Sequence, residues 1–297
     1  MSTLFIIGNG FDIWNRLPTS YRNFNEEYKE NLDEHINYFD DFCHIDAEWA
    51  NFEESLGSFN QDDFHNNAAV QPSLEELGDD PKRLPGYEDE ITIKIEELVN
   101  DITRAFNSWI RSIDVNAAQK LMHFTFPACF INFNYTNTLQ DVYNIPDVSV
   151  LHIHGKVGRE IFFGHGRKID STRRTNESDE PWFDDALSEV AQVLENFHKP
   201  VDEILARNRV ILEGYVDVEN IVVIGHSVND IDVPYFQCIL NAYPDANWQN
   251  YNYENIEECI DEVSETHKKL LALGVPEQQL ESYSSENLEE IYPALST

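Results

Sequence analysis

Five short apolar runs, each ending in Gly, Asn or Ser, constrain the fold of this chain more than any other feature. They are LFIIG (4–8), CFINFN (129–134), VSVLHIHG (148–155), EIFFGHG (160–166) and NIVVIGHS (220–227). Continuous apolar runs of this length, bounded by turn residues, are typical of strands that are covered on both faces. We therefore predict an α/β fold, doubly wound around a mostly parallel sheet, with its ligand site at the carboxyl ends of the strands.

The region of about 120 residues between the first two predicted strands has helical periodicity. Its helical segments are 21–42, 47–59 and 88–113, with a loop at 71–89. A direct crossover needs far fewer residues, so we predict a single α/β domain over 1–297 with a large helical insertion or cap at approximately 20–125, above the end of the first strand. Later elements are expected as a loop at 170–186, a helix at 187–215 broken near Pro200, a strand at 247–254 and a helix ending at Gly274.

The charge of the chain is strongly negative. It has 55 acidic and 20 basic residues, for a formal net charge of -35 at pH 7. Such a field opposes binding to nucleic acid and to anionic membrane, so we expect no direct nucleic-acid or membrane partner. The four cysteines form no C-x-x-C pair, and the first apolar run is far shorter than the roughly 20 residues of a membrane span. We expect a cytoplasmic protein without a disulfide framework.

The first strand runs into a Gly-Asn-Gly turn at Gly8, Asn9 and Gly10. Glycine permits close approach of a ligand, and exposed amides in such a turn can bind a phosphate. The G-x-G-x-x-G pattern is incomplete because Ile13 stands at its third position, so a tight turn needed only for packing stays open as an alternative. We predict that the turn amides hold a dinucleotide phosphate, with Asn9 turned inward.

Asparagine and histidine residues follow the next two strands. In INFNYTNTL, Asn134 stands at the end of its strand and is expected to face the ligand site, whereas Thr136 or Asn137 is expected to cap the following helix. In LHIHG, His152 and His154 project to one side of a strand. We expect His152 to be a hydrogen-bonded core histidine and His154, beside a glycine at the strand end, to be the general base or ligand contact.

The last run, IVVIGHSVNDIDVPYF, joins a buried strand to a helix through a polar turn. Gly225, Ser227 and Asp230 are predicted to contact ribose or phosphate, and Asp230 or Asp232 to cap the helix. Ser227 does not fit a hydrolase nucleophile, because the G-x-S-x-G motif requires glycine where Asn229 stands. A metal-dependent hydrolase built from His152, His154 and Asp230 is an open alternative, although we expect no metal, because the ligand spacing is not recognisable.

An ordered series of motifs resembles the AbiH abortive-infection family of bacterial anti-phage proteins. The motifs are IIGNGFD, LPTSY, W-x-x-FE, FNYTNTL, HIHG, HKP and GHSVNDIDVPYF, and the resemblance spans residue 4 to about residue 253. It implies an anti-phage protein that acts in abortive infection.

That family is in turn similar, more distantly, to the sirtuin-like Rossmann fold of several anti-phage NADases. The sirtuin-like motifs match GNG at Gly8, NYT at Asn134, HG at His154 and GHSVND at Gly225. This similarity implies that Asn134 positions water or ribose and that His154 assists at the ribose hydroxyls. The chain departs from the sirtuin pattern at two positions, with Asp12 in the first turn and Thr136 in place of an aspartate.

These resemblances imply an NAD glycohydrolase gated by a phage-encoded trigger protein. NAD is then the substrate or ligand, with ADP-ribose or a related nucleotide as an alternative, and Asp12 could bind a ribose hydroxyl. A homo-oligomer is a further candidate assembly. The second reading is a nucleotide-binding sensor or interaction protein without catalysis, and the third is the metal-dependent hydrolase.

Overall fold

The computed structural model describes residues 2–28, 43, 49–50, 52–60, 87–167, 192–252 and 264–293. The chain divides into two compact units. The first consists of Met1–Ser20, Ile110–Phe162 and Pro200–Thr297, and the second of Tyr21–Trp109 and Phe163–Lys199. Each unit is described by itself below, and the prediction of a cap above the first strand stays a prediction.

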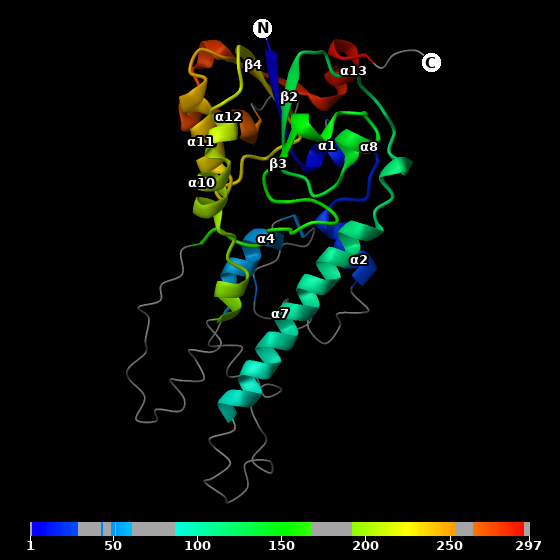
Figure 1. The fold of residues 1–297 in the computed structure, drawn as a ribbon, viewed down its shortest axis with the longest axis vertical. Helices are drawn as coiled ribbons and strands as arrows, with labels where there is room; N and C mark the ends of the chain where they lie inside the picture. Colours follow the sequence, from blue (N-terminus) through cyan, green and yellow to red (C-terminus); the bar gives the residue numbers. More distant parts are fainter. Residues whose placement is uncertain are drawn as a thin grey trace, which may run out of the picture. The chain divides into compact units, whose positions relative to one another are not determined.

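A six-stranded sheet forms the centre of the first unit, and all of its strands are parallel (Figure 1). Its strands are β1 (Ser2–Ile7), β2 (Ala128–Asn132), β3 (Val150–His152), β4 (Val218–Ile224), β5 (Asn247–Asn252) and β6 (Leu280–Ser284). The strand order is β3-β2-β1-β4-β5-β6. This is the order of the Rossmann fold, in which the chain direction across the sheet reverses between β1 and β4. The predicted α/β, Rossmann-like fold with a mostly parallel sheet is confirmed.

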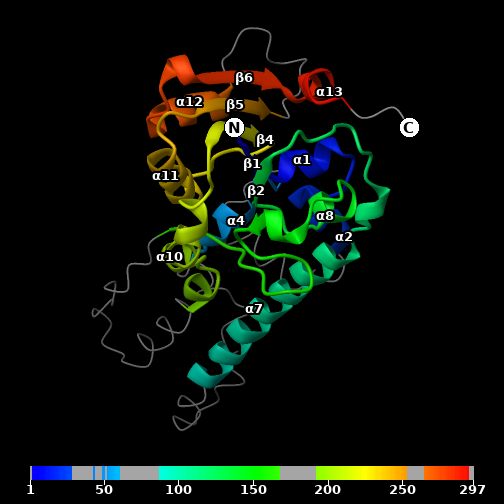
Figure 2. The ribbon, with the colours of Figure 1, turned by 45° about the horizontal axis from the view of Figure 1, so that its top comes forward.

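Helices cover both faces of this sheet, as Figure 2 shows. The helices of the first unit are α1 (Asn9–Trp14), α8 (Thr138–Asp141), α10 (Val201–Leu212), α11 (Val233–Ala242), α12 (Glu265–Leu273) and α13 (Leu288–Ile291). Alternate residues of β1 enter two separate cores: Leu4 and Ile6 pack with α10, α11 and α12, whereas Phe5 and Ile7 pack with α1, α8 and α13. Burial on both faces explains why the strand sequences are continuously apolar.

The second unit is built around one long helix and shorter ones. The long helix is α7 (Tyr87–Ser112), and the shorter ones are α2 (Tyr21–Tyr28) and α4 (Phe52–Ser55). The part of α7 from Ile110 onward belongs to the first unit. Phe24 packs against Trp109 and Phe106 of α7, with ring centroids 5.3 and 5.7 Å apart. None of the helices in the part of the chain that the structure describes has the length and apolar character needed to cross a membrane.

Several predicted elements agree with the structure, one predicted strand is wrong, and one observed strand was not predicted. The strand at 247–254 is β5, the helix break near Pro200 precedes α10, and Gly274 ends α12 with a φ of 103°. The strand predicted at 160–166 is wrong: this segment forms only isolated bridges, and Gly164 has a φ of 133° that interrupts an extended run. The edge strand β6 was not predicted, because its sequence LESYS is mostly polar. The loops predicted at 71–89 and 170–186 lie outside the described residues.

Candidate functional site

The turn after β1 packs directly against the turn after β4. The Gly8 amide donates to the Ile224 carbonyl at 2.9 Å, and the Gly10 amide donates to the Gly225 carbonyl at 2.8 Å. A Cβ on Gly10 would lie 2.8 Å from the Gly225 Cα, and one on Gly225, whose φ is +62°, would lie 2.3 Å from the Phe11 amide nitrogen. Such distances are far below normal contact, so these turns need glycine because two backbones touch.

The same bonds bear on the predicted phosphate site. The amides of Gly8 and Gly10 already donate hydrogen bonds to carbonyl groups. They could therefore bind a phosphate only after the turns rearrange. The side chain of Asn9 donates from Nδ2 to the Thr19 carbonyl at 2.8 Å and so fixes the segment that follows α1. Nucleotide binding by these three residues stays a prediction.

Asp12 of α1 is fully buried, with an exposed fraction of 0%. Thr136 donates from Oγ1 to the Asp12 carboxylate at 2.5 Å, and its hydroxyl lies 3.0 Å from that of Thr138. Burial raises the pKa of Asp12 to about 6, against the opposing hydrogen bonds of Thr136, Thr138 and Asn134. The two positions that depart from the sirtuin pattern, Asp12 and Thr136, are therefore hydrogen-bonded to each other.

Asn134 links the end of β2 to the turn after β1. Its Nδ2 donates to the Gly8 carbonyl at 3.0 Å, and its backbone amide donates to Oδ1 of Asn132 at the same distance. The side chain is almost completely buried, with 6% of the residue exposed. Asn134 therefore lies beside the tip of β1, and its role toward a ligand stays a prediction.

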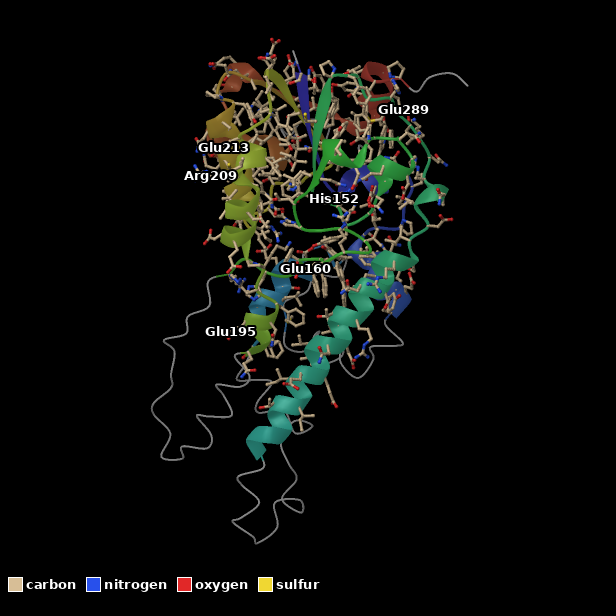
Figure 3. All side chains as sticks on the ribbon, viewed as in Figure 1. His152, Glu160, Glu195, Arg209, Glu213 and Glu289 are labelled. Carbon is tan, nitrogen blue, oxygen red and sulfur yellow. The ribbon has the colours of Figure 1, made fainter. Side chains whose placement is uncertain are left out.

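His152 lies at the carboxyl end of β3 (Figure 3). Its Nδ1 is 3.2 Å from the Asn134 carbonyl oxygen, and its Nε2 is 2.9 Å from Nε2 of Gln140. Burial lowers its pKa to about 4, so the ring is neutral at pH 7. A neutral ring with a proton on Nδ1 donates to the carbonyl and accepts from Gln140. His152 is half-buried with both ring nitrogens hydrogen-bonded, which agrees with a structural histidine but not with a place in the core.

His154 belongs to a second group of polar side chains, centred on Asp232. Its Nε2 lies 3.5 Å from Oδ1 of Asp232, while Nε2 of His226 lies 3.4 Å from Oδ2 of the same carboxylate. All three residues are buried, with exposed fractions of 3%, 8% and 5% for His154, Asp232 and His226. The Val228 amide donates to Nδ1 of His226 at 2.9 Å. This bond leaves the proton of His226 on Nε2, facing Asp232.

Aromatic rings surround the Asp232 group. The Phe133 ring centroid is 4.3 Å from that of His226 and 5.4 Å from that of His154. The Tyr235 ring is 5.5 Å from His154 and is fully buried. Apolar walls of this kind exclude water and strengthen the interaction of a carboxylate with a histidine that gains a proton. The rings therefore shield the carboxylate and the two histidines from water.

The turn after β4 places its residues differently from the sequence-based prediction. Asp230 and Ser227 are exposed, and Ser227 donates from Oγ to Oδ1 of Asn229 at 3.0 Å. Asp232 occupies the N-cap position of α11, but its side chain makes no capping hydrogen bond and faces the histidines instead. The pairing of His226 with Asp232, and this role of Asp232, were not predicted from the sequence. Ligand contacts by Gly225, Ser227 and Asp230 stay predictions.

The cap predicted for α8 also differs in detail. Asn137 is the N-cap residue, yet its side chain accepts no capping hydrogen bond from a backbone amide, and the Thr136 hydroxyl bonds to Asp12 instead. In the described ranges no three His, Cys, Asp or Glu residues are grouped as metal ligands. The metal-hydrolase alternative, based on His152, His154 and Asp230, therefore has no such cluster to support it.

The second unit has a polar cluster of its own around Glu53. The Glu53 carboxylate accepts hydrogen bonds from the Tyr21 hydroxyl and the Lys199 ammonium group, and from the Gly164 amide at 3.3 Å. Lys199 is 3% exposed. Tyr21, Glu53 and Lys199 come from the motifs LPTSY, W-x-x-FE and HKP, so three distant motifs meet at one carboxylate.

We expect Lys199→Met to destabilise the second unit by about 3 kcal/mol, because it leaves the Glu53 carboxylate buried without its cation. The measurement is urea unfolding followed by circular dichroism. The double variant Glu53→Gln with Lys199→Met removes both charges and should recover most of the loss. Equal stability of the single variant and the wild type would contradict the assignment of Glu53 and Lys199 as a buried pair.

Comparison with known proteins gives one match. The sequence model of the family described as "Bacteriophage abortive infection AbiH" matches residues 4–253. No curated protein and no solved structure matches the chain significantly. The matched range begins within β1 and ends after β5, so it includes both the Asp12 and the Asp232 groups.

Proposed function

The chain belongs to the AbiH family of bacteriophage abortive-infection proteins, and from this premise we propose that its Rossmann-like unit is an NAD glycohydrolase that depletes NAD in infected cells. A role in abortive infection follows from the family. The reaction and its substrate are the proposal.

One observation carries the proposal. The carboxyl ends of β1, β2, β3 and β4 bring together Asn134 and the His154, Asp232 and His226 group, and they lie on either side of the point where the strand order reverses. Open α/β sheets bind nucleotides at this point. A histidine beside a carboxylate is suited to act as the general base that activates water for hydrolysis of a glycosidic bond.

The reaction would proceed by cleavage of the bond between C1′ of the ribose and the nicotinamide nitrogen. The bonding electrons pass to the pyridinium ring, which leaves as neutral nicotinamide, and a water oxygen forms the new bond to C1′. Asn134 positions this water or the ribose, and His154 accepts the proton that the water loses, with Asp232 stabilising the charged imidazole. The products are nicotinamide, ADP-ribose and one proton.

The activity would be gated by a phage component, because an NAD glycohydrolase that is always active would kill its host. The direct test is to incubate the purified full chain with NAD and to measure nicotinamide release by chromatography, with and without lysate of phage-infected cells. Release that requires the lysate supports both the reaction and the gate. Absence of release under both conditions, from a protein that protects cells, would reject the glycohydrolase.

A non-catalytic nucleotide sensor is the second candidate. It is favoured by the turns after β1 and β4, whose glycine amides are already hydrogen-bonded and would have to rearrange around a ligand. Such a rearrangement would convert ligand binding into a conformational signal. Binding of NAD or ADP-ribose without nicotinamide release is the result that this candidate predicts.

We expect Asp232→Asn to lower kcat for NAD hydrolysis by about tenfold to a hundredfold, because the neutral amide no longer stabilises a protonated His154. The loss should be smaller than that caused by removing His154, since the contact between Asp232 and His154 is long, at 3.5 Å. Steady-state kinetics of nicotinamide release measure it. His267→Gln is the control, since His267 of α12 is hydrogen-bonded to Ser282 of β6 and not to the Asp232 group. An unchanged kcat in Asp232→Asn would remove Asp232 from the mechanism.

A further inference from the structure

We propose that His226 is a positioning residue, which holds the Asp232 carboxylate in the orientation that His154 needs. This inference rests on the proposed function. It goes beyond it by giving a role to a histidine that takes no part in the reaction steps above and that acts only through Asp232.

The Asp232 carboxylate presents one oxygen to each of two histidines. Nε2 of His154 lies 3.5 Å from Oδ1, and Nε2 of His226 lies 3.4 Å from Oδ2. Asp232 stands at the N-cap position of α11, but its side chain makes no capping hydrogen bond that would set its rotation. Because the carboxylate is planar, a contact that fixes Oδ2 also fixes where Oδ1 lies. His226 is therefore placed to aim Oδ1 at His154.

The backbone amide of Val228 selects the tautomer of His226. It donates to Nδ1 at 2.9 Å, so Nδ1 carries the lone pair and the neutral ring has its proton on Nε2. This proton faces the Asp232 carboxylate. The opposite tautomer would turn a lone pair toward the negative charge and an N–H toward the Val228 amide. His226 is thus a donor toward Asp232.

The Val228 amide is held in place by an uncommon backbone conformation. Val228 has a φ of +48°, in the left-handed region that β-branched residues avoid. Residues in such conformations persist only where their surroundings enforce them, and they concentrate at functional sites. The turn after β4 therefore keeps a strained residue whose amide meets Nδ1 of His226.

The ring of His226 has little freedom to rotate. Its centroid is 4.3 Å from that of Phe133 and 5.0 Å from that of Phe236, and the residue is buried. On the backbone side, a Cβ on Gly8 would lie 2.6 Å from the His226 Cα, so the turn after β1 packs directly on this residue. Contacts on the ring and on the backbone together fix the position of Nε2.

The Gly8 contact also connects His226 to the other half of the site. The Gly8 carbonyl accepts a hydrogen bond from Nδ2 of Asn134 at 3.0 Å, while the Gly8 backbone lies against His226. The same turn therefore sets the place of Asn134 and of the histidine that orients Asp232.

The kinetic test compares three substitutions at position 226. His226→Phe keeps a ring without Nε2–H and should lower kcat for NAD hydrolysis by about threefold to tenfold, the size of one net hydrogen bond, with KM unchanged. His226→Gln places an amide N–H near the position of Nε2 and should recover most of kcat. His226→Asn is one methylene shorter, keeps an acceptor near Nδ1 for the Val228 amide, and should not recover it.

The comparison of His226→Gln with His226→Asn decides, because His226→Phe also removes the acceptor of the Val228 amide. Equal kcat values in these two variants, or a wild-type kcat in His226→Phe, would overturn the inference.

An Asp232→Asn background separates positioning from packing. If His226 acts through Asp232, adding His226→Phe to Asp232→Asn should not lower kcat further, since no carboxylate remains to be oriented. The same loss in both backgrounds would mean that His226 supports the site by packing alone.

NMR tests the contact between His226 and Asp232 without any activity. In protein labelled with 15N-histidine, at about pH 8, where an ordinary histidine is neutral, the His226 ring should have a protonated Nε2 and an unprotonated Nδ1. Its resonances are assigned by their loss in His226→Gln. In Asp232→Asn the Nε2 proton should move upfield, because an amide oxygen is a weaker acceptor than a carboxylate.

A proton on Nδ1, or an Nε2 proton that Asp232→Asn leaves unchanged, would overturn the inference. These outcomes are distinct from failure of the proposed function. If NAD is not hydrolysed under any condition, the glycohydrolase proposal fails, and the His226 resonances still decide whether this histidine holds Asp232.

Discussion

His154→Ala should reduce nicotinamide release by about a hundredfold to ten-thousandfold, the usual contribution of a general base. The reason is that His154 is the residue that the proposed mechanism assigns to accept the proton of the attacking water. His226 is prevented from doing so by the Val228 amide, which occupies its Nδ1. Steady-state release of nicotinamide, measured at saturating NAD and with infected-cell lysate, gives the ratio of kcat values.

Asn134→Ala should give a loss of similar size, with protection of cells against phage lost in both variants. The matched controls are His267→Ala and Asn208→Ala, which remove the same side chains at positions bonded to Ser282 and Ile204. Both controls should keep NAD hydrolysis and protection. If His154→Ala and Asn134→Ala bind NAD and still protect cells, catalysis is not how the protein acts, and the sensor is the better reading.

Much of the fold could be predicted because the buried strands carry their own signal. Phe130, Ile131 and Val223 lie on central strands covered on both faces, so only apolar residues are tolerated there. The edge strand β6 lacks that requirement on its exposed side and reads as polar. The strand predicted at 160–166 was wrong because apolar residues can be needed for packing without belonging to a sheet. Phe162 packs against Arg207, and Phe163 stacks on Phe106.

Site residues could be predicted only where a polar side chain closely follows the end of a predicted strand. Asn134 and His154 each lie two residues beyond a strand, and Asn134 contacts the turn after β1 through the Gly8 carbonyl. Asp12 and Asp232 lie on or beside helices, where an acid is most often a cap or a solvated residue. Their burial depends on contacts with Thr136 and His226 from other strands, and no local pattern records such contacts.

The second large effect is expected at Gly225. Gly225→Ala should destabilise the first unit by about 4 kcal/mol, through the combined cost of a left-handed backbone and an overpacked contact. The backbone φ is +62°, and the new Cβ would lie 2.3 Å from the amide nitrogen of Phe11 and 2.5 Å from the carbonyl carbon of Gly10. Both neighbours are backbone atoms, so the two turns would have to separate, breaking the hydrogen bond from the Gly10 amide to the Gly225 carbonyl.

Gly158→Ala is the control that isolates the contact from the backbone conformation. Gly158 has a similar φ, +81°, but nothing lies within 4 Å of its Cβ position. Gly158→Ala should lower the free energy of unfolding only by the cost of the left-handed backbone, about 1–2 kcal/mol. Unfolding in urea, followed by circular dichroism, measures both variants.

Since Asn134 donates to the carbonyl of Gly8 in the displaced turn, Gly225→Ala should also lose NAD hydrolysis, whereas Gly158→Ala should keep it. Equal losses of stability in the two variants would mean that the turns after β1 and β4 do not touch, and that the site is not assembled around their contact.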